Sequence, residues 1–220
     1  MEKDMISVLK DSKLFQGLEV DEIENICNII KASEREYSKN QIIVNQGEPV
    51  SKIGILKKGS AISMKYRFDG NAQLLRVYNQ GEVFSLDAVN TTLLTSPVTL
   101  ISQTDSIVVF IPYAKIFEAE TIAPETKKVI MANSSEMLGN ELIRLMYKID
   151  VLSKRTLRER ILTYLSLIRE RSTGNTFDIG MNQEQFAQYL CVNRSVLSKE
   201  LNQMRKSGLI DYRGSRFTLF

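Results

Sequence analysis

Apolar side chains recur at helical spacing in two short runs between residues 181 and 208. Phe186, Ala187 and Leu190 share one face of the first run, and Ala187 is small enough to admit a neighbouring helix. The apolar positions of the second run are Val196, Leu197, Leu201 and Met204. Because a short break separates the two runs, the pattern predicts a helix-turn-helix whose second helix ends at Ser207-Gly208.

The open side of this second helix is rich in hydrogen-bond donors. A recognition helix presents such side chains to base edges and phosphates in the major groove of DNA. After the helix, residues 209–212 and 216–219 predict a β-hairpin wing with two arginines at its tip. We therefore predict DNA contacts from Asn193, Arg194, Ser195, Ser198, Lys199, Arg205, Arg213 and Arg216.

Two further observations bear on this interpretation. Cys191 occupies the turn position that usually holds glycine, and a left-handed backbone there is strained for a residue with a β-carbon. The charge distribution favours DNA binding, because residues 154–220 hold 12 Lys plus Arg against 6 Asp plus Glu, whereas residues 1–153 hold 17 against 20. The alternative is a small helical core with a solvated polar face.

Between residues 37 and 113 the pattern changes to short β-rich runs separated by turns that contain glycine. Asp69-Gly70 lies between two of these runs and predicts a hairpin turn. The candidate strands are residues 42–44, 52–56, 61–68, 72–78, 98–102 and 107–111. Because no helical pattern interrupts them, they predict a closed antiparallel barrel or roll. Before them, residues 5–32 have helical spacing.

A long helical segment follows Pro124, and its apolar positions alternate at spacings of four and three over about three heptads. These positions are Met131, Leu138, Leu142, Leu145, Ile149 and Leu152, with Ser135 at the remaining position. The spacing predicts a coiled-coil seam between two copies of the chain. The alternative is a helix packed on its own barrel, which Ile143 and Met146 beside the seam also suit.

Residues 154–171 predict a further amphipathic helix, which opens the basic part of the chain. A short hinge near Ser153 and Lys154 separates it from the long helix. We therefore expect an α+β chain of three parts. An antiparallel β-roll sensor domain occupies residues 1–119, a dimerisation helix residues 120–153, and a winged helix-turn-helix domain residues 154–220.

The composition narrows the classes of function. With 220 residues and 43% hydrophobic content, the chain can build stable cores. The amino terminus lacks the pattern of a secretory signal, and no run approaches the roughly twenty apolar residues that span a bilayer. The two cysteines, Cys27 and Cys191, indicate neither a disulfide framework nor a metal cluster, so we expect a chain of the reducing cytoplasm.

The chain has no histidine. This removes Ser-His and Cys-His nucleophilic sites as well as zinc and haem held by histidine. Carboxylates such as Glu22, Glu24, Glu34 and Glu36 lie in polar surroundings and indicate a solvated surface. We therefore expect no enzyme activity, no catalytic residue, no metal site and no resident cofactor.

The order of a β-roll, a long helix and a winged helix-turn-helix resembles the CRP/FNR family of bacterial transcription regulators over essentially the whole chain. The motifs that carry the resemblance are Gln46-Gly47-Glu48-Pro49, Ile55-Leu56-Lys57-Lys58-Gly59-Ser60, Gly81-Glu82-Val83-Phe84 and Arg194-Ser195-Val196-Leu197-Ser198-Lys199. The resemblance implies a homodimer that binds double-stranded DNA at an inverted-repeat operator. It also implies an effector in the β-roll and RNA polymerase as a partner.

Departures from the family pattern concern the effector. Members that read cyclic nucleotides hold the cyclic phosphate with an arginine, but no Arg or Lys lies between Arg76 and Lys115. The turn offers Glu82 and Asp87, which would repel a phosphate. An effector pocket is expected from Phe84, Ser85, Leu86 and Asp87 together with Leu145 and Met146, which suit an apolar ligand.

The segment 81–88 resembles the FNR-like branch of the family more closely. Oxygen sensors of that branch hold an iron–sulfur cluster with several cysteines, and only Cys27 lies in the sensor half. The sequence therefore predicts a regulator with an unidentified effector and with neither an iron–sulfur cluster nor haem. A regulator that responds to a cyclic nucleotide, and a DNA-binding protein without any effector, remain as alternatives.

Overall fold

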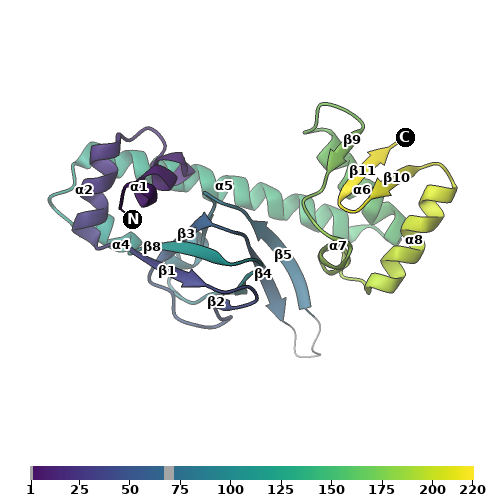
Figure 1. The fold of residues 1–220 in the computed structure, drawn as a ribbon, viewed down its shortest axis with the longest axis horizontal. Helices are drawn as coiled ribbons and strands as arrows, with labels where there is room; N and C mark the ends of the chain where they lie inside the picture. Colours follow the sequence, from purple (N-terminus) through teal and green to yellow (C-terminus); the bar gives the residue numbers. More distant parts are fainter. Residues whose placement is uncertain (1, 67–71) are drawn as a thin grey trace. The chain divides into compact units, whose positions relative to one another are not determined.

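The computed structural model describes residues 2–66 and 72–220, so the predicted hairpin turn at Asp69-Gly70 lies outside the described residues. The chain forms two compact units (Figure 1). The first comprises the chain up to residue 141 without residues 72–74, and the second comprises residues 72–74 and 142–220. No helix in the described part of the chain is long and apolar enough to cross a membrane.

The amino-terminal segment is divided into three short helices rather than the single one that residues 5–32 predict. These are α1 (Glu2–Asp11), a 3-10 turn (Lys13–Phe15) and α2 (Val20–Ile30). The break occurs at Gly17, whose positive φ of 89° favours glycine. Glu19 and Glu22 then start α2 with a capping box, and the backbone N–H of Glu19 lowers the pKa of Glu22.

The strands confirm an antiparallel roll. One sheet has the order β1-β8-β3-β6 and the other the order β2-β7-β4-β5. The bounds are β1 (Ser33–Tyr37), β2 (Ile42–Val44), β3 (Ile53–Lys58), β4 (Ala61–Tyr66), β5 (Ala72–Tyr78), β6 (Val83–Phe84), β7 (Thr99–Ser102) and β8 (Ser106–Ile111). Two short helices, α3 (Leu86–Val89) and α4 (Tyr113–Glu118), complete this unit.

Two hydrophobic cores stabilise the roll unit. One lies inside the roll and contains Tyr37, Ile43, Leu56, Ala61, Tyr78, Phe84, Leu100 and Val108. The other joins α1, α2 and α4 to the strands through side chains such as Leu9, Ile23, Ile55 and Ile116. Buried side chains of this kind each stabilise the fold by about 1.5–3 kcal/mol.

The long helix α5 (Pro124–Ser153) leads into α6 (Leu157–Arg169), which begins with a capping box between Thr156 and Glu159. The second unit then contains α7 (Gln183–Tyr189), α8 (Arg194–Lys206) and a sheet of order β10-β11-β9. Its strands are β9 (Thr176–Asp178), β10 (Ile210–Arg213) and β11 (Arg216–Leu219). The winged helix-turn-helix that the sequence predicts is therefore present. Strand β9 is an additional strand that the sequence did not indicate.

Lys148 of α5 is buried in the second unit, with 3% of its surface exposed. Its ammonium group lies 4.0 Å from the centre of the Tyr189 ring and donates a hydrogen bond to the carbonyl of Leu74. Burial lowers the pKa of Lys148 to about 7, while the nearby Cys191 opposes this shift and Arg144 adds to it. Above pH 7 the neutral amine is therefore favoured at the contact between α5 and α7.

We expect the stability of this unit to depend on pH through Lys148. Between pH 7 and the ordinary lysine value of 10.5, the unfolded chain binds a proton that the folded chain does not, so stability rises with pH. The slope is up to about 1.4 kcal/mol per pH unit. Lys148→Met should flatten this slope and leave the unit at least as stable at pH 7, because methionine places no ionisable group at this buried position.

Urea unfolding followed by circular dichroism at pH 7, 8 and 9 measures the slope. Lys128→Met is the matched control, because Lys128 lies on the same helix but is exposed. The control should keep the slope of the unaltered chain. An equal slope in Lys148→Met and the unaltered chain would contradict this account of Lys148.

Candidate functional site

The packing of α7 and α8 fixes which side of α8 faces outward. Leu197, Leu201 and Met204 each have 0% of their surface exposed. Phe186 and Leu190 of the α7 segment are buried as well, and α7 and α8 are in contact. Because apolar side chains at this spacing occupy one face of α8, the opposite face is left to the polar side chains.

The turn between the two helices contains the predicted irregularity. Cys191 has a φ of 58°. This is the left-handed backbone conformation expected at a turn position that usually holds glycine. The backbone N–H of Val192 donates to the carbonyl of Ala187 over 3.0 Å and closes the turn. The turn therefore keeps its geometry with cysteine in place of glycine, at a cost of about 1–2 kcal/mol.

The outward face of α8 carries the predicted contact residues. Asn193, Arg194, Ser195 and Lys199 are exposed, and Ser198 is partly buried. Asn193 stands at the N-cap, but its side chain makes no capping hydrogen bond. These groups are concentrated in the first turns of the helix, where the helix dipole and free backbone N–H groups also favour an anion such as phosphate.

Val196 lies on this same outward face, with 50% of its surface exposed. The sequence pattern predicted that Val196 is on the buried face, which is wrong because Leu197, Leu201 and Met204 fill the core. An exposed apolar side chain beside polar ones is suited to contact with the methyl group of thymine. The sequence contained a signal for this exposure, because Ser195, Val196 and Lys199 fall on one side of a helix.

Arg205 has an intramolecular role that the sequence did not indicate. Its Nε atom lies 2.9 Å from a carboxylate oxygen of Asp211, and its guanidinium lies 4.1 Å from the centre of the Tyr212 ring. The same guanidinium also donates to the carbonyl of Tyr212. These contacts join the end of α8 to β10, so Arg205 positions the wing and is less free to bind DNA.

The wing places its two arginines directly opposite each other. Arg213 and Arg216 are paired in the register of β10 and β11, and both are exposed. Gly214, with a φ of 63°, permits the tight turn between them. Asp178 of β9 accepts a hydrogen bond from the Ser215 hydroxyl over 2.8 Å. The backbone N–H of Gly180 and this hydroxyl lower the pKa of Asp178. The hairpin tip is therefore both cationic and held in place.

The outer face of α5 carries most of the predicted seam. Met131, Leu142, Leu145 and Ile149 are exposed, with Leu142 at 62% and Ile149 at 68%. Leu138 and Leu152 are partly buried, and Leu138 packs against the core of its own unit. Ile143 and Met146 beside the seam are also exposed.

The predicted effector turn is largely filled by its own side chains. Phe84, Ser85 and Leu86 are buried, whereas Asp87 is exposed. A Cβ atom at Gly54 would lie 2.0 Å from the Phe84 ring, so this glycine is required for the ring to lie against β3. Phe84 is thus part of the roll core, while Leu145 and Met146 are exposed on α5.

Glu82 has a cationic partner, which corrects the expectation of a repelling carboxylate. Arg76 donates to Glu82 over 2.5 Å and to Glu141 of α5 over 2.7 Å. The guanidinium also lies 4.6 Å from the centre of the Tyr78 ring. Arg76 is thereby engaged on three sides and links the turn at Gly81 to α5 within one unit.

Comparison with known families decides the classification. A model of the cyclic nucleotide-binding domain matches residues 34–119, and a model of the Crp-like helix-turn-helix domain matches residues 159–220. The chain belongs to the CRP/FNR family. Members of this family are transcription regulators rather than enzymes, and the chain is a DNA-binding transcription regulator of this kind.

Individual relatives of this CRP/FNR family member place it near FNR-type regulators. Electron transport regulator A of Shewanella oneidensis is 23% identical over 90% of this chain and 78% of its own length. The transcriptional activator protein anr of Pseudomonas aeruginosa is also 23% identical, over 90% of this chain and 80% of its own length.

Solved structures agree with the fold. The c-di-GMP responsive global regulator CLP of Xanthomonas campestris has a TM-score of 0.73 at 17% identity, covering 92% of this chain and 99% of its own. FixK2 of Bradyrhizobium japonicum has a TM-score of 0.63 at 20% identity, covering 86% and 92%. At these identities the likeness establishes the architecture and not the ligand.

Arg194 offers the sharpest test of how this regulator reads DNA. If its guanidinium donates two hydrogen bonds to a guanine, Arg194→Ala should cost roughly 1–3 kcal/mol of binding and relax specificity at one base position per half-site. Arg194→Lys keeps the charge but loses the paired geometry, so it should relax specificity almost as much. Binding titrations on the preferred duplex and on single-base variants measure both effects.

A phosphate contact predicts a different pattern. In that case Arg194→Ala would weaken binding equally on specific and random DNA, and Arg194→Lys would restore most of the affinity. That result would contradict base reading by Arg194.

Proposed function

We propose that the protein acts as a homodimer that binds an inverted-repeat operator and that an effector in the β-roll modulates this binding. The proposal rests on the way α8 packs. Its apolar face is fully buried at Leu197, Leu201 and Met204, while its first turns present Arg194 and Lys199 outward. A helix held in this way can enter the major groove and keep a fixed register on the bases.

The roles of the exposed residues follow from their chemistry. Arg194 is proposed to read guanine, with Ser195 and Ser198 contacting an adjacent base or phosphate and Lys199 contacting guanine or the backbone. Asn193 at the N-cap and the wing arginines Arg213 and Arg216 are proposed to contact phosphates. Arg205 contributes by holding the wing against α8.

The exposed face of α5 supports the homodimer. Leu142, Met146 and Ile149 each have 60% or more of their surface exposed, and they follow one another at helical spacing. A contiguous apolar stripe of this kind marks an interaction surface. A second copy of α5 presents the same stripe, so a twofold-symmetric pairing buries both.

Twofold symmetry then sets the form of the operator. Two recognition helices on one side of a duplex reach major grooves about one helical turn, roughly 34 Å, apart. We propose that the protein works in the cytoplasm and that RNA polymerase is a partner, as the family resemblance implies. In vitro selection from random duplexes should enrich an inverted repeat, and affinity for it should fall by about 0.9 log units per phosphate contact for each log unit of salt. Selection of a site without twofold symmetry would contradict the proposal.

Leu142→Asp tests the dimer. Leu142 is already 62% exposed, so the substitution should leave the single chain folded. In the dimer it places a carboxylate in a buried seam, which is costly, and the dimer should dissociate. Operator affinity should fall at least tenfold, because a single chain engages only one half-site.

Light scattering at micromolar concentration and an operator titration measure these two effects. Asn140→Asp is the matched control, because it introduces the same charge at an exposed position of α5 outside the seam. A dimer of Leu142→Asp that is as stable as the control would show that the seam lies elsewhere.

The effector is proposed not to be cyclic AMP or cyclic GMP. A buried cyclic phosphate needs a cationic partner, and Arg76 beside the turn is already bound to Glu82 and Glu141. We expect calorimetry with either nucleotide at millimolar concentration to show no saturable heat and operator affinity to stay unchanged. Saturable heat together with tighter operator binding would contradict this.

A further inference from the structure

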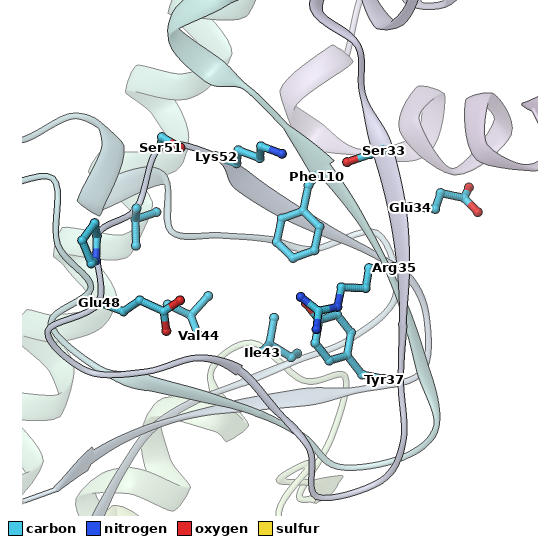
Figure 2. Close-up of a pocket in the computed structure, with 12 residues that line it drawn as sticks. Ser33, Glu34, Arg35, Tyr37, Ile43, Val44, Glu48, Ser51, Lys52 and Phe110 are labelled. Carbon is cyan, nitrogen blue, oxygen red and sulfur yellow. The ribbon is translucent and has the colours of Figure 1, made fainter.

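A hollow of about 360 Å³ opens between β1 and the segment that follows β2, and the turn at Gly81 does not line it (Figure 2). Its floor is formed by Tyr37, Ile43 and Phe110, which are buried or partly buried. Arg35 and Lys52 lie at its edge and are exposed. The volume falls within the range of roughly 300–1,000 Å³ that is typical of sites for small molecules.

The alternation of β1 explains why these side chains meet. Arg35 and Tyr37 are two positions apart on one strand, so they point to the same face of the sheet, and Phe110 pairs with Ser33 on this face in the register of β1 and β8. Figure 2 shows Arg35 and Phe110 pointing into the hollow, with Glu48 across from them. The hollow is therefore a continuation of the roll interior that is open to solvent.

The charges around the hollow leave a positive excess. Glu34 is bound to the buried Lys57 over 2.8 Å, whereas Glu48 accepts from the backbone N–H of Asn45 over 2.9 Å and keeps its negative charge. Arg35 lies 5.1 Å from the centre of the Tyr37 ring. Within residues 2–66 and 72–220, neither Arg35 nor Lys52 forms an ion pair. Two cations and the Glu48 carboxylate therefore surround an apolar, aromatic floor, which leaves an excess of one positive charge.

We propose that this hollow is the effector site and that it binds a small aromatic carboxylate. The ring of such a ligand packs on Phe110 and Tyr37 in the offset or edge-on geometry that aromatic pairs prefer. Its carboxylate accepts hydrogen bonds from Arg35, whose planar guanidinium matches a carboxylate, and is attracted by Lys52. This assignment rests on the proposed regulatory function, because it names the ligand class of the effector.

Aromatic contacts connect the hollow to α5 within the same unit. The ring centres of Tyr37 and Phe110 are 6.4 Å apart, those of Phe110 and Phe84 are 6.4 Å apart, and those of Phe84 and Tyr78 are 6.0 Å apart. The Tyr78 ring in turn contacts the guanidinium of Arg76, which binds Glu141 of α5. A ligand that shifts Phe110 can thus alter the ion pair that holds α5, and this contiguous packing gives the effect a physical route.

The test compares 3-phenylpropionate with its neutral amide, 3-phenylpropionamide, by calorimetry on the full chain. The carboxylate should bind saturably with a Kd of roughly 10 µM to 1 mM, and the amide at least about tenfold more weakly. Arg35→Gln should weaken carboxylate binding about tenfold or more, and Lys52→Gln by a smaller factor. Both side chains are exposed, so neither substitution disturbs the core.

Lys39→Gln is the matched control, because Lys39 is an exposed lysine of the same unit that does not line the hollow. It should bind the carboxylate like the unaltered chain. Saturating 3-phenylpropionate should also change affinity for the selected duplex at least about threefold, and Arg35→Gln should abolish this change.

Four results would overturn the assignment: no saturable binding of the carboxylate, equal binding of the amide, equal losses in Arg35→Gln and Lys39→Gln, or ligand binding that leaves DNA affinity unchanged. Duplex binding without ligand is measured in the same series. Its absence would overturn the proposed function, whereas its presence with any of the four results overturns only the effector site.

Discussion

The exposed apolar stripe on α5 is the constraint on which the proposed assembly depends. Within one chain, Leu142, Met146 and Ile149 stay in contact with water, although apolar surface gains roughly 25 cal/mol for each Å² that is buried. A helix that packed only on its own roll would turn such residues inward. The proposed homodimer accounts for the stripe, because a second α5 presents a matching apolar pattern.

The same helix also connects the sensor to the DNA-binding part along the chain. Its residues up to Glu141 belong to the roll unit, where Arg76 binds Glu141, and the rest belong to the unit of α7 and α8, where Lys148 contacts the Tyr189 ring. The ion pair at Glu141 and the buried Lys148 two turns later each restrain α5. A change at either contact acts directly on the position of α5. In the proposed dimer, the pairing of two α5 helices would transmit this change to both chains.

Local pattern was sufficient to predict much of this architecture. The alternating or continuous apolar runs located six strands of the roll and both strands of the wing within a few residues, and helical spacing located α5, α6, α7 and α8. Strand β1 was missed because its residues, Ser33 to Tyr37, are mostly charged and polar, and it is held by pairing with β8 over seventy residues away. Such long-range pairing leaves no signal in a local window.

The site was predictable in its residue types but not in its contacts. Arg194, Ser195 and Lys199 face outward as helical spacing requires, whereas the exposure of Val196 depends on how α8 packs. The pairing of Arg205 with Asp211, and of Arg76 with Glu82 and Glu141, depends on tertiary geometry. The hollow at Arg35 and Phe110 likewise arises from residues that are far apart in the sequence.

The central claim is that two copies of the chain bind one operator through paired α5 helices. The mass of the complex between the protein and the selected duplex, measured by light scattering, tests it most directly. The account predicts a protein mass of twice the 25.1 kDa of one chain on each duplex, and the same ratio when protein is limiting. A stable complex that contains one chain per duplex, with the full affinity, would contradict it.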